Sequence, residues 1–342
     1  MQAIKMVWAS FIGLFAFAGE KLHSALFGYM ANTGMVLGAA PMRNTDFRAV
    51  VEPILNQFFD GVYDQRKDEW KQVFREVQAT IERAYFEEPV GYGFGAAPEL
   101  PDGMPVTYQQ GGILFNKRYT YKVFGLAFGL TKVLVEDGDH VNIGSTFSKH
   151  LAQSLVETKE TRCANVLNRA FNSSYLGGDG VSLSNASHPI VGGTFSNLLA
   201  TPAALSQTSL EQVLIQIRKA VDNNGKRIRL SPQKLVISPD NTFQAEVLLK
   251  SVLRAGTNNN DINPIKSAST LSSDPAILSR LTSATAWWVT TDTPEGLKLI
   301  QRRKLSKSME GDFETDSVRY KATERYIEGW TDARAAYGTP GA

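Results

Sequence analysis

The fold is decided by one stretch, residues 119–171, which reads YTYKVFGLAFGLTKVLVEDGDHVNIGSTFSKHLAQSLVETKETRCANVLNRAF. Its first part, residues 119–135, is rich in the β-branched and aromatic residues that favour strands. The turn residues Glu136-Asp137-Gly138-Asp139 follow. From Ser145 to Phe171 no Gly or Pro occurs, which predicts one helix of roughly 40 Å at 1.5 Å per residue. A long rigid helix beside long strands is more typical of a structural building block than of a catalytic pocket.

The composition is that of an ordinary globular protein. The chain has 342 residues, of which 43% are hydrophobic and 20% are charged, and its net charge is +2. That length predicts one large domain or two to three smaller ones, with a substantial core. The small net charge does not indicate a nucleic-acid reader or a membrane-surface binder. The single cysteine, Cys163, cannot form an intramolecular disulfide, and we expect a small buried residue rather than a reactive thiol.

The N-terminal segment has three interpretations. Residues 6–19 form a short apolar run after Lys5, and Ala16-Phe17-Ala18 resembles a cleavage site, as in a secretory signal. The run is too short for a comfortable membrane span. It also suits an apolar arm that packs on the same or a neighbouring molecule. In the third interpretation the natural start lies downstream, at Met35 or Met42.

Two helices and a long excursion are expected before the opening stretch. Apolar residues spaced along one face predict a helix over residues 46–59, with Pro53 inside it, and a second helix over residues 67–85. From Glu88 to Gly112 prolines and glycines are too dense for a helix. Such a long irregular segment is uncommon in a compact domain unless it binds something. Strand-favouring flanks therefore predict a hairpin-like excursion that projects from the body.

The second half of the chain is predicted to be an α/β unit. Thr208 and Glu211 have the spacing of a capping box at the start of a helix, and Gly225 is a natural residue for its end. The further elements expected are a strand at 234–238, a helix at 241–253, and strands at 285–290, 296–301 and 318–328.

No arrangement of residues indicates catalysis. The four histidines are scattered without the i, i+4 spacing of a zinc site, and they are His23, His140, His150 and His188. For His188 we expect a structural hydrogen bond. The glycines of residues 91–95 fit a dinucleotide fingerprint poorly, because Pro98 and Pro101 follow where a helix should open. Neither a nucleophile elbow nor a phosphate loop occurs. We therefore expect a non-enzymatic protein without a catalytic residue, cofactor or metal.

A basic cluster near the C-terminal third has two interpretations. It consists of Arg302, Arg303 and Lys304, with Lys307 close by in the sequence. In the first interpretation it is a solvated edge that pairs with acids, and these are Glu310, Asp312 and Glu314. In the second it contacts nucleic-acid phosphates or carboxylates of a neighbouring subunit.

Several short motifs follow one another in an order that is typical of one family. They are NVLNRAFNSSY (165–175), GGDGV (177–181), SHP (187–189), LIQI (214–217), NNDIN (259–263), ATERY (322–326) and the tail GTPGA (338–342). Each motif is weak alone, but their number and order are specific. With the order of the predicted elements, residues 42–342 resemble the major capsid proteins of tailed bacteriophages with the HK97-type fold. Among these the chain is most similar to the Mu-like major head subunit type.

The resemblance implies an α+β HK97-type capsid fold. Residues 1–85 would be an apolar leader and helical arm, and 86–118 the extended loop, which reaches over a neighbouring subunit. Residues 119–189 and 301–342 would form the peripheral domain with a spine helix at 145–171, and 190–300 the axial domain. The expected intersubunit contacts are Phe86, Tyr92, Phe94, Met104, Tyr108 and Phe115, and Arg302, Arg303 and Lys304 would contact DNA or a subunit. Lys117 lies near this loop, but no motif marks it as a cross-linking lysine.

The function that the resemblance implies is that of a major capsid protein. It would self-assemble through hexamers and pentamers into the icosahedral head of a tailed bacteriophage and enclose double-stranded DNA by non-specific contacts. Scaffolding, portal and decoration proteins are the further partners expected, and no membrane. The protein would be part of the virion and assemble in the host bacterial cytoplasm. An encapsulin-like compartment shell is the alternative on the same fold, and the signal-like N-terminus alone suggests a secreted hydrolase.

Overall fold

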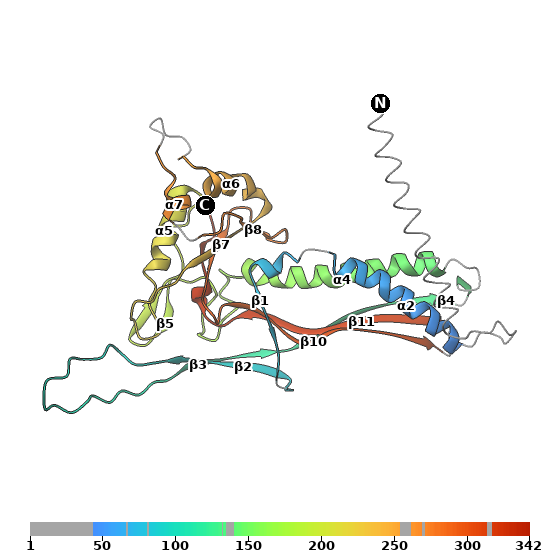
Figure 1. Cartoon of the computed structure of the whole chain (residues 1–342), viewed down its shortest axis with the longest axis horizontal. Helices are drawn as coiled ribbons and strands as arrows, with labels where there is room; N and C mark the ends of the chain where they lie inside the picture. Colours follow the sequence, from blue (N-terminus) through green and yellow to red (C-terminus); the bar gives the residue numbers. More distant parts are fainter. Residues whose placement is uncertain are drawn as a thin grey trace. The chain divides into compact units, whose positions relative to one another are not determined.

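The computed structural model describes residues 44–65, 68–80, 82–131, 133–134, 140–253, 261–268, 271–312 and 317–342 (Figure 1). Two compact units divide the chain, residues 1–47 and residues 48–342. The three interpretations of the N-terminal segment concern residues outside the described ones. The elements discussed below belong to the second unit, apart from the first turn of helix α2 (Asn44–Tyr63).

A four-stranded sheet contains the longest strands of this unit. Its strands are β1 (Arg75–Gln78), β10 (Leu297–Asp312), β11 (Ser317–Trp330) and β4 (Lys122–Thr131), in that order. Strands β10 and β11 form a long antiparallel pair, β4 pairs antiparallel with β11, and β1 runs parallel to β10. Figure 1 shows helix α4 (His140–Asn168) lying along these strands. We call this sheet the long sheet.

Helices α2 and α4 are joined to each other and to the long sheet. The Ser148 hydroxyl donates to the Leu55 carbonyl at 2.7 Å, which ties α4 to α2. The Tyr320 hydroxyl donates to Asn56 Oδ1 at 2.7 Å, which ties β11 to the same helix. The expected helix around Pro53 is confirmed, with Pro53 inside α2. The long helix is also confirmed, although it begins earlier and ends earlier than residues 145–171.

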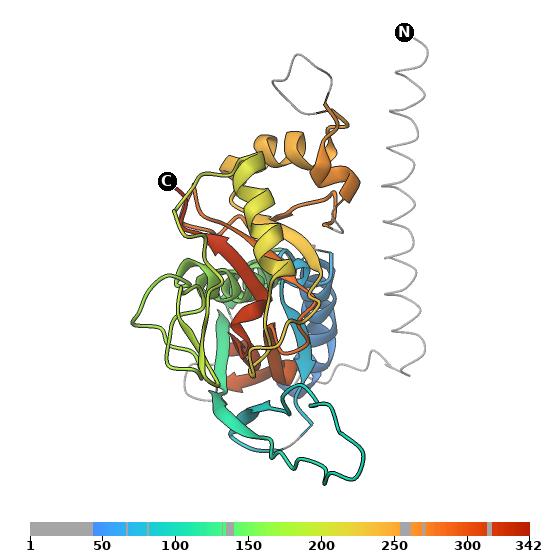
Figure 2. The same cartoon turned by 90° about the vertical axis from the view of Figure 1, so that its left-hand side faces the viewer.

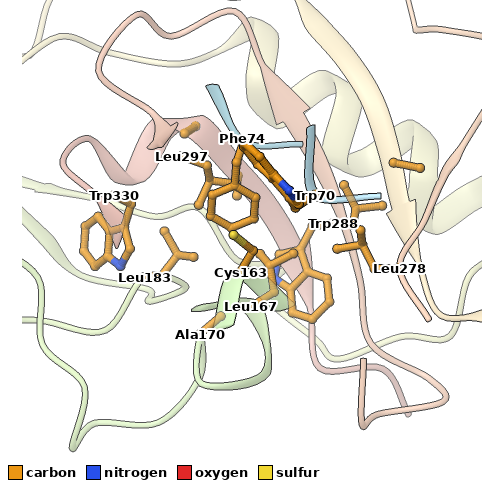
Figure 3. Packing of buried hydrophobic residues seen from close by; sticks show 14 of the residues in the cluster. Trp70, Phe74, Cys163, Leu167, Ala170, Leu183, Leu278, Trp288, Leu297 and Trp330 are labelled. Atoms are coloured by element: carbon orange, nitrogen blue, oxygen red, sulfur yellow. The ribbon is translucent and has the colours of Figure 1, made fainter. Parts of the chain in front are cut away.

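The main hydrophobic core is built from residues far apart in the sequence. Cys163 and Leu167 of α4 pack with Trp70 and Phe74, and with Trp288 of strand β9 (Trp287–Thr291) (Figure 3). Cys163 is 1% exposed, and burial raises the pKa of its thiol well above the ordinary value. The expectation of a small buried cysteine is confirmed.

A second sheet lies in the second half of the chain. Its order is β12 (Ala336–Thr339), β9, β7 (Pro232–Ile237) and β8 (Ala276–Ile277). Its own core joins these strands to helices α5 (Gln207–Arg218), α6 (Thr242–Lys250) and α7 (Pro264–Ala268). A 3₁₀ turn, η2 (Pro239–Asn241), precedes α6, and a separate small hairpin joins β5 (His188–Ile190) to β6 (Gly193–Phe195). The α+β class is confirmed.

The C-terminal strand differs from the expected arrangement. Residues 301–342 were all expected in the domain of the long helix, yet β12 pairs antiparallel with β9 in the second sheet. The 3₁₀ turn η3 (Ala333–Ala335) comes between β11 and β12 and takes the chain out of the long sheet. Tyr337 of β12 is 1% exposed and packs in the core of the second sheet. The burial of this side chain explains why β12 belongs to the second sheet.

The helix predicted over residues 67–85 is wrong. The chain instead forms the 3₁₀ turn η1 (Trp70–Gln72), then strand β1, and later strand β2 (Tyr85–Tyr92). Trp70 and Phe74 are four residues apart, as on one face of a helix, but a short turn brings both into the core. Ile81 lies outside the described residues.

The start of α5 is also displaced from its predicted position. The capping box is formed by Ser206 and Ser209, whose side chains each accept from the other's backbone N–H at 3.2 and 3.0 Å. Glu211 instead accepts from the Gln207 amide at 2.9 Å within the helix. Gly225 does not end this helix, because α5 stops at Arg218 and Gly225 sits with φ 78° in a later turn.

The buried carboxylate of Glu160 predicts a pH dependence of stability. Its two oxygens accept the backbone N–H groups of Glu69 at 2.7 Å and Trp70 at 3.0 Å. Burial raises the pKa of this carboxyl from 4.5 to about 7. The unfolded chain releases the proton at lower pH than the folded protein does, so the free energy of unfolding falls as pH rises from about 4.5 to about 7.

We expect Glu160→Gln to remove this fall, which is roughly 3 kcal/mol for a rise in pKa from 4.5 to about 7. Urea unfolding of dilute subunit at pH 5, 6, 7 and 8 measures it. Glu211→Gln, on the surface of α5, is the matched control and should keep the wild-type slope. An unchanged slope in Glu160→Gln would contradict this account of the core carboxyl.

Candidate functional site

A separate two-stranded hairpin is the most distinctive surface feature. Strand β2 pairs antiparallel with β3 (Gly112–Thr120), from Tyr85 opposite Thr120 to Tyr92 opposite Gly112. The two form a separate two-stranded sheet. We call β2, β3 and the residues between them the loop hairpin, and residues 93–111 the connection. Figures 1 and 2 show the connection, in teal, clear of the two larger sheets.

The connection exposes an unusual amount of apolar surface. All of its residues are exposed. Phe94 is 59% exposed, Met104 61% and Tyr108 94%. Leu100 and Val106 are also exposed, and a hollow of about 440 Å³ lies among these residues. Because exposed apolar patches on soluble proteins commonly mark interaction sites, the connection is the candidate functional surface.

The six residues expected at subunit contacts do not share one environment. Phe94, Met104 and Tyr108 lie on the exposed connection. Phe86 packs against Tyr119, with ring centroids 6.3 Å apart. Phe115 lies so close to Gly178 that a Cβ added there would stand 2.7 Å from its ring. The Tyr92 ring covers Gly112 in the same way. The first three are therefore available to a partner, and the last three hold the loop hairpin together or against the body.

A buried ion-pair network anchors the base of the loop hairpin. Lys298 of β10 is 3% exposed and pairs with Glu88 of β2 and, at 2.8 Å, with Glu295. The Thr331 hydroxyl donates to Glu88 and lies 2.6 Å from the Tyr119 hydroxyl. The sequence analysis missed this anchor, because Glu88 and Lys298 are far apart in the sequence and neither has a local signal.

Two further segments also hold the hairpin. The Asn223 amide donates to the Gly91 carbonyl at 2.8 Å, and the Asn224 amide donates to the Phe94 carbonyl at 3.2 Å. The Lys117 ammonium donates to the Leu176 carbonyl at 3.1 Å. The direction in which the connection leaves the body is therefore set by contacts on both strands.

The basic residues of β10 do not form one uniform patch. Arg302 is half-buried and lies 3.8 Å from Glu82, and Arg303 donates to the Thr323 hydroxyl at 3.0 Å. Lys304 is exposed. The expected acid partners differ: Glu310 lies 3.9 Å from Lys321, whereas the side chains of Asp312 and Glu314 are outside the described part of the chain. Bulges at Gln301–Arg303 and Arg303–Ser306 break the alternation that would align the three side chains.

The histidines offer no catalytic arrangement in the described part of the chain. His188 is fully buried, with Nδ1 2.6 Å from Asp179 and Nε2 3.2 Å from Asn197. Its ring stacks on Phe195, with centroids 4.8 Å apart. This is the structural hydrogen bonding expected of His188. His150 is exposed, whereas His23 and the His140 side chain lie outside the described residues.

Two searches of the described residues gave negative results. No cluster of three or more His, Cys, Asp or Glu side chains is placed to hold a metal ion there. None of the described helices is long and apolar enough to cross a membrane.

Comparison with known proteins identifies one family. Residues 117–338, more than half of the chain, match the model of a family described as phage capsid protein. A search of curated proteins finds no significant match.

Similar solved structures include three capsid or particle proteins. A virus-like particle from Pyrococcus furiosus has 11% identity and a TM-score of 0.47, covering 85% of this chain and 99% of that one. The procapsid of bacteriophage JBD30 has 14% identity and a TM-score of 0.46, covering 87% of this chain and 76% of that one. The capsid of the native GTA particle has 16% identity and a TM-score of 0.47, covering 81% and 91%.

Proposed function

The chain belongs to the phage capsid protein family, and from this membership we propose that it is the major capsid protein of a tailed bacteriophage. It self-assembles into an icosahedral head that encloses double-stranded DNA. The observation that carries the assembly role is the loop hairpin, whose connection is exposed along its whole length and rich in apolar side chains. A monomer gains nothing from exposing these residues, whereas a shell buries them between subunits.

Strand β4 gives a second surface suited to assembly. It lies at the end of the long sheet, pairing with β11 on one side only in the described structure. Val123 is 61% exposed and Leu126 51%. An unpaired edge with apolar side chains favours the addition of a neighbour's backbone. Contacts between different surfaces of identical subunits close into rings, as pentamers and hexamers require.

The finer assignments follow from the sequence resemblance and are part of the proposal. The protein is of the Mu-like major head subunit type, with scaffolding, portal and decoration proteins as partners, and assembles in the host bacterial cytoplasm. Its role is structural and needs no catalytic residue. The peripheral domain comprises 119–189 with 301–335, and the axial domain 190–300 with 336–342, because β12 lies in the second sheet.

The exposed residues of the basic cluster, Arg303 and Lys304, contact packaged DNA. Arg303 and Lys304 are exposed, whereas Arg302 is half-buried beside Glu82. Two weakly paired cations on each subunit suit non-specific phosphate contact without strong adhesion of the empty shell.

The exposed apolar residues of the connection should govern assembly but not folding. We expect the triple change Phe94→Ser, Met104→Ser and Tyr108→Ser to raise the concentration needed for assembly at least tenfold, because less apolar surface is then buried between subunits. The melting temperature of the subunit should stay within about 2 °C, since exposed changes alter stability little. Light scattering against protein concentration, with thermal unfolding, measures both.

Phe86→Ala is the control for this triple variant. Because Phe86 packs on Tyr119, its removal should lower the melting temperature. If the triple variant assembled at wild-type concentrations, the connection would not be the contact surface.

Expression of the full chain alone and with its neighbouring genes tests the function. Gradient sedimentation and negative-stain microscopy should show closed particles in at least one of these conditions. Particles that enclose a protein cargo and no DNA would favour the encapsulin-like alternative. Protein that stays monomeric at high concentration in every condition would contradict the proposal.

A further inference from the structure

A basic groove lies at the foot of the loop hairpin, on the body of the molecule. It has a volume of about 450 Å³ and lies between β3, α4 and β11. Five of its lining residues are cationic, and they are Lys117, Arg118, Lys122, Arg162 and Arg169. Glu328 is the one acidic residue that lines it among the described residues. Tyr119, Tyr175 and Trp330 add aromatic walls. We call this hollow the basic groove.

Ion pairs neutralise only part of this charge. Arg162 pairs with Glu328, with Nε 3.0 Å from the carboxylate, and Arg118 pairs with Glu87 at 2.6 Å. Lys117 donates to a backbone carbonyl, and the Arg169 guanidinium lies 4.4 Å from the Tyr175 ring centroid. Lys122 is exposed. Within the described structure, Lys117, Lys122 and Arg169 therefore form no ion pair with a carboxylate, although the Asp179 carboxylate acts on Lys117 at longer range.

The partial burial of the Lys117 ammonium group makes the groove suited to an anion. Burial lowers the pKa of its ammonium group from the ordinary value. A carboxylate brought into the groove would stabilise the charged form and offset this cost of burial. Arg118 and Arg162 would then remain in their present pairs, so the incoming group would meet Lys117, Lys122 and Arg169.

The connection has the complementary chemistry. Residues 93–111 contain Glu99 and Asp102 and no Lys or Arg. Both carboxylates are exposed, and apolar Leu100 and Met104 lie beside them. Two carboxylates flanked by apolar side chains match a groove that combines unpaired cations with aromatic walls.

We propose that the basic groove of one subunit receives the acidic tip of the connection, Glu99 and Asp102, from a second copy of the chain. The pairing rests on the proposed function, because assembly brings the second copy to the groove. A duplex nucleic acid is a poorer occupant, since about 450 Å³ accommodates a few side chains rather than a helix. The contact steers association and fixes the register between neighbours.

Zero-length carbodiimide coupling of wild-type particles tests this contact directly. The reaction joins a carboxylate to an ammonium group only where the two touch. We expect dimers and larger species on a denaturing gel, with peptides that link Glu99 or Asp102 to Lys117 or Lys122. Glu99→Gln with Asp102→Asn should abolish these peptides. Dimers that link the two carboxylates to other lysines, or wild-type particles without such peptides, would overturn the proposal.

Charge reversal gives an independent test. Lys122→Glu with Arg169→Glu, or Glu99→Lys with Asp102→Lys, should each lower particle yield about tenfold or more. Combining all four changes should restore at least part of the yield. Arg83→Glu, a change at an exposed residue that does not line the groove, is the control and should assemble normally.

The outcomes separate this proposal from the proposed function. If the wild-type chain forms no particles under any condition, the function itself is contradicted. If it forms particles and the reversed variants do so equally well, only the groove assignment fails. Groove variants that assemble at full yield but retain less DNA would assign the groove to nucleic acid instead.

Discussion

Replacing residues 93–111 with the two residues Asn-Gly is expected to give a folded subunit that forms no shell. Strand β2 ends at Tyr92 and β3 begins at Gly112, so a two-residue hairpin turn can join them directly. Every residue removed is exposed, and none belongs to the hydrophobic clusters of the body. The replacement therefore removes the surface that meets a neighbouring subunit and leaves the core intact.

Circular dichroism, thermal unfolding and sedimentation measure the effect of this replacement. The melting temperature should stay within a few degrees of the wild-type subunit. Particle yield should fall below detection. A matched control replaces only Gly93 by Ala, which has free space around its Cβ position and should assemble normally. Intact particles from the shortened chain would refute the assignment of the connection as the intersubunit arm.

Lys298→Met is expected to destabilise the subunit by about 3 kcal/mol, the typical cost of removing one partner from a buried ion pair. Lys298 is 3% exposed and its ammonium group lies between Glu88 and Glu295. Its removal leaves the Glu88 carboxylate partly buried beside the Thr331 hydroxyl and the acidic Glu295, without a cation. Because Glu88 belongs to β2, the base of the loop hairpin should loosen as well.

Two measurements check this second prediction. Urea unfolding gives the free energy, and hydrogen exchange at residues 85–92 and 112–120 reports the loosening. Glu88→Gln together with Lys298→Met should recover part of the stability, because the carboxylate that remains unpaired, Glu295, is half exposed and Glu88 no longer carries a charge. Lys250→Met removes an exposed pair with Glu246 and should change neither measurement. A Lys298→Met subunit as stable as wild type would contradict the anchor.

The features that the sequence predicts best have strong local causes. The long helix follows from a stretch without Gly or Pro, and the connection follows from dense breakers between strand-favouring flanks. Both are present, as α4 and as residues 93–111. Phe94, Met104 and Tyr108 are exposed, as expected of a breaker-rich excursion that buries few of its own side chains, whereas their role as subunit contacts is what the family resemblance implies and stays a prediction.

The features that the sequence does not predict depend on distant partners. Trp70 and Phe74 have helical spacing, but their burial is determined by α4 and β9. Strand β12 has a short, ordinary sequence, and its place depends on pairing with β9. The Glu88–Lys298 pair forms where β2 meets β10, and the basic groove forms where β3, α4 and β11 meet. No local sequence pattern indicates contacts between such distant elements, so they cannot be predicted from one sequence.

A cryo-electron microscopy map of the particles tests the central claim most directly. The account predicts a closed shell in which residues 93–111 of each subunit lie against a neighbouring subunit, with Phe94, Met104 and Tyr108 covered. Strands β2 and β3 should stay fixed to their own body through Glu88 and Lys298. A shell in which the connection folds back on its own subunit or faces only solvent would contradict the account.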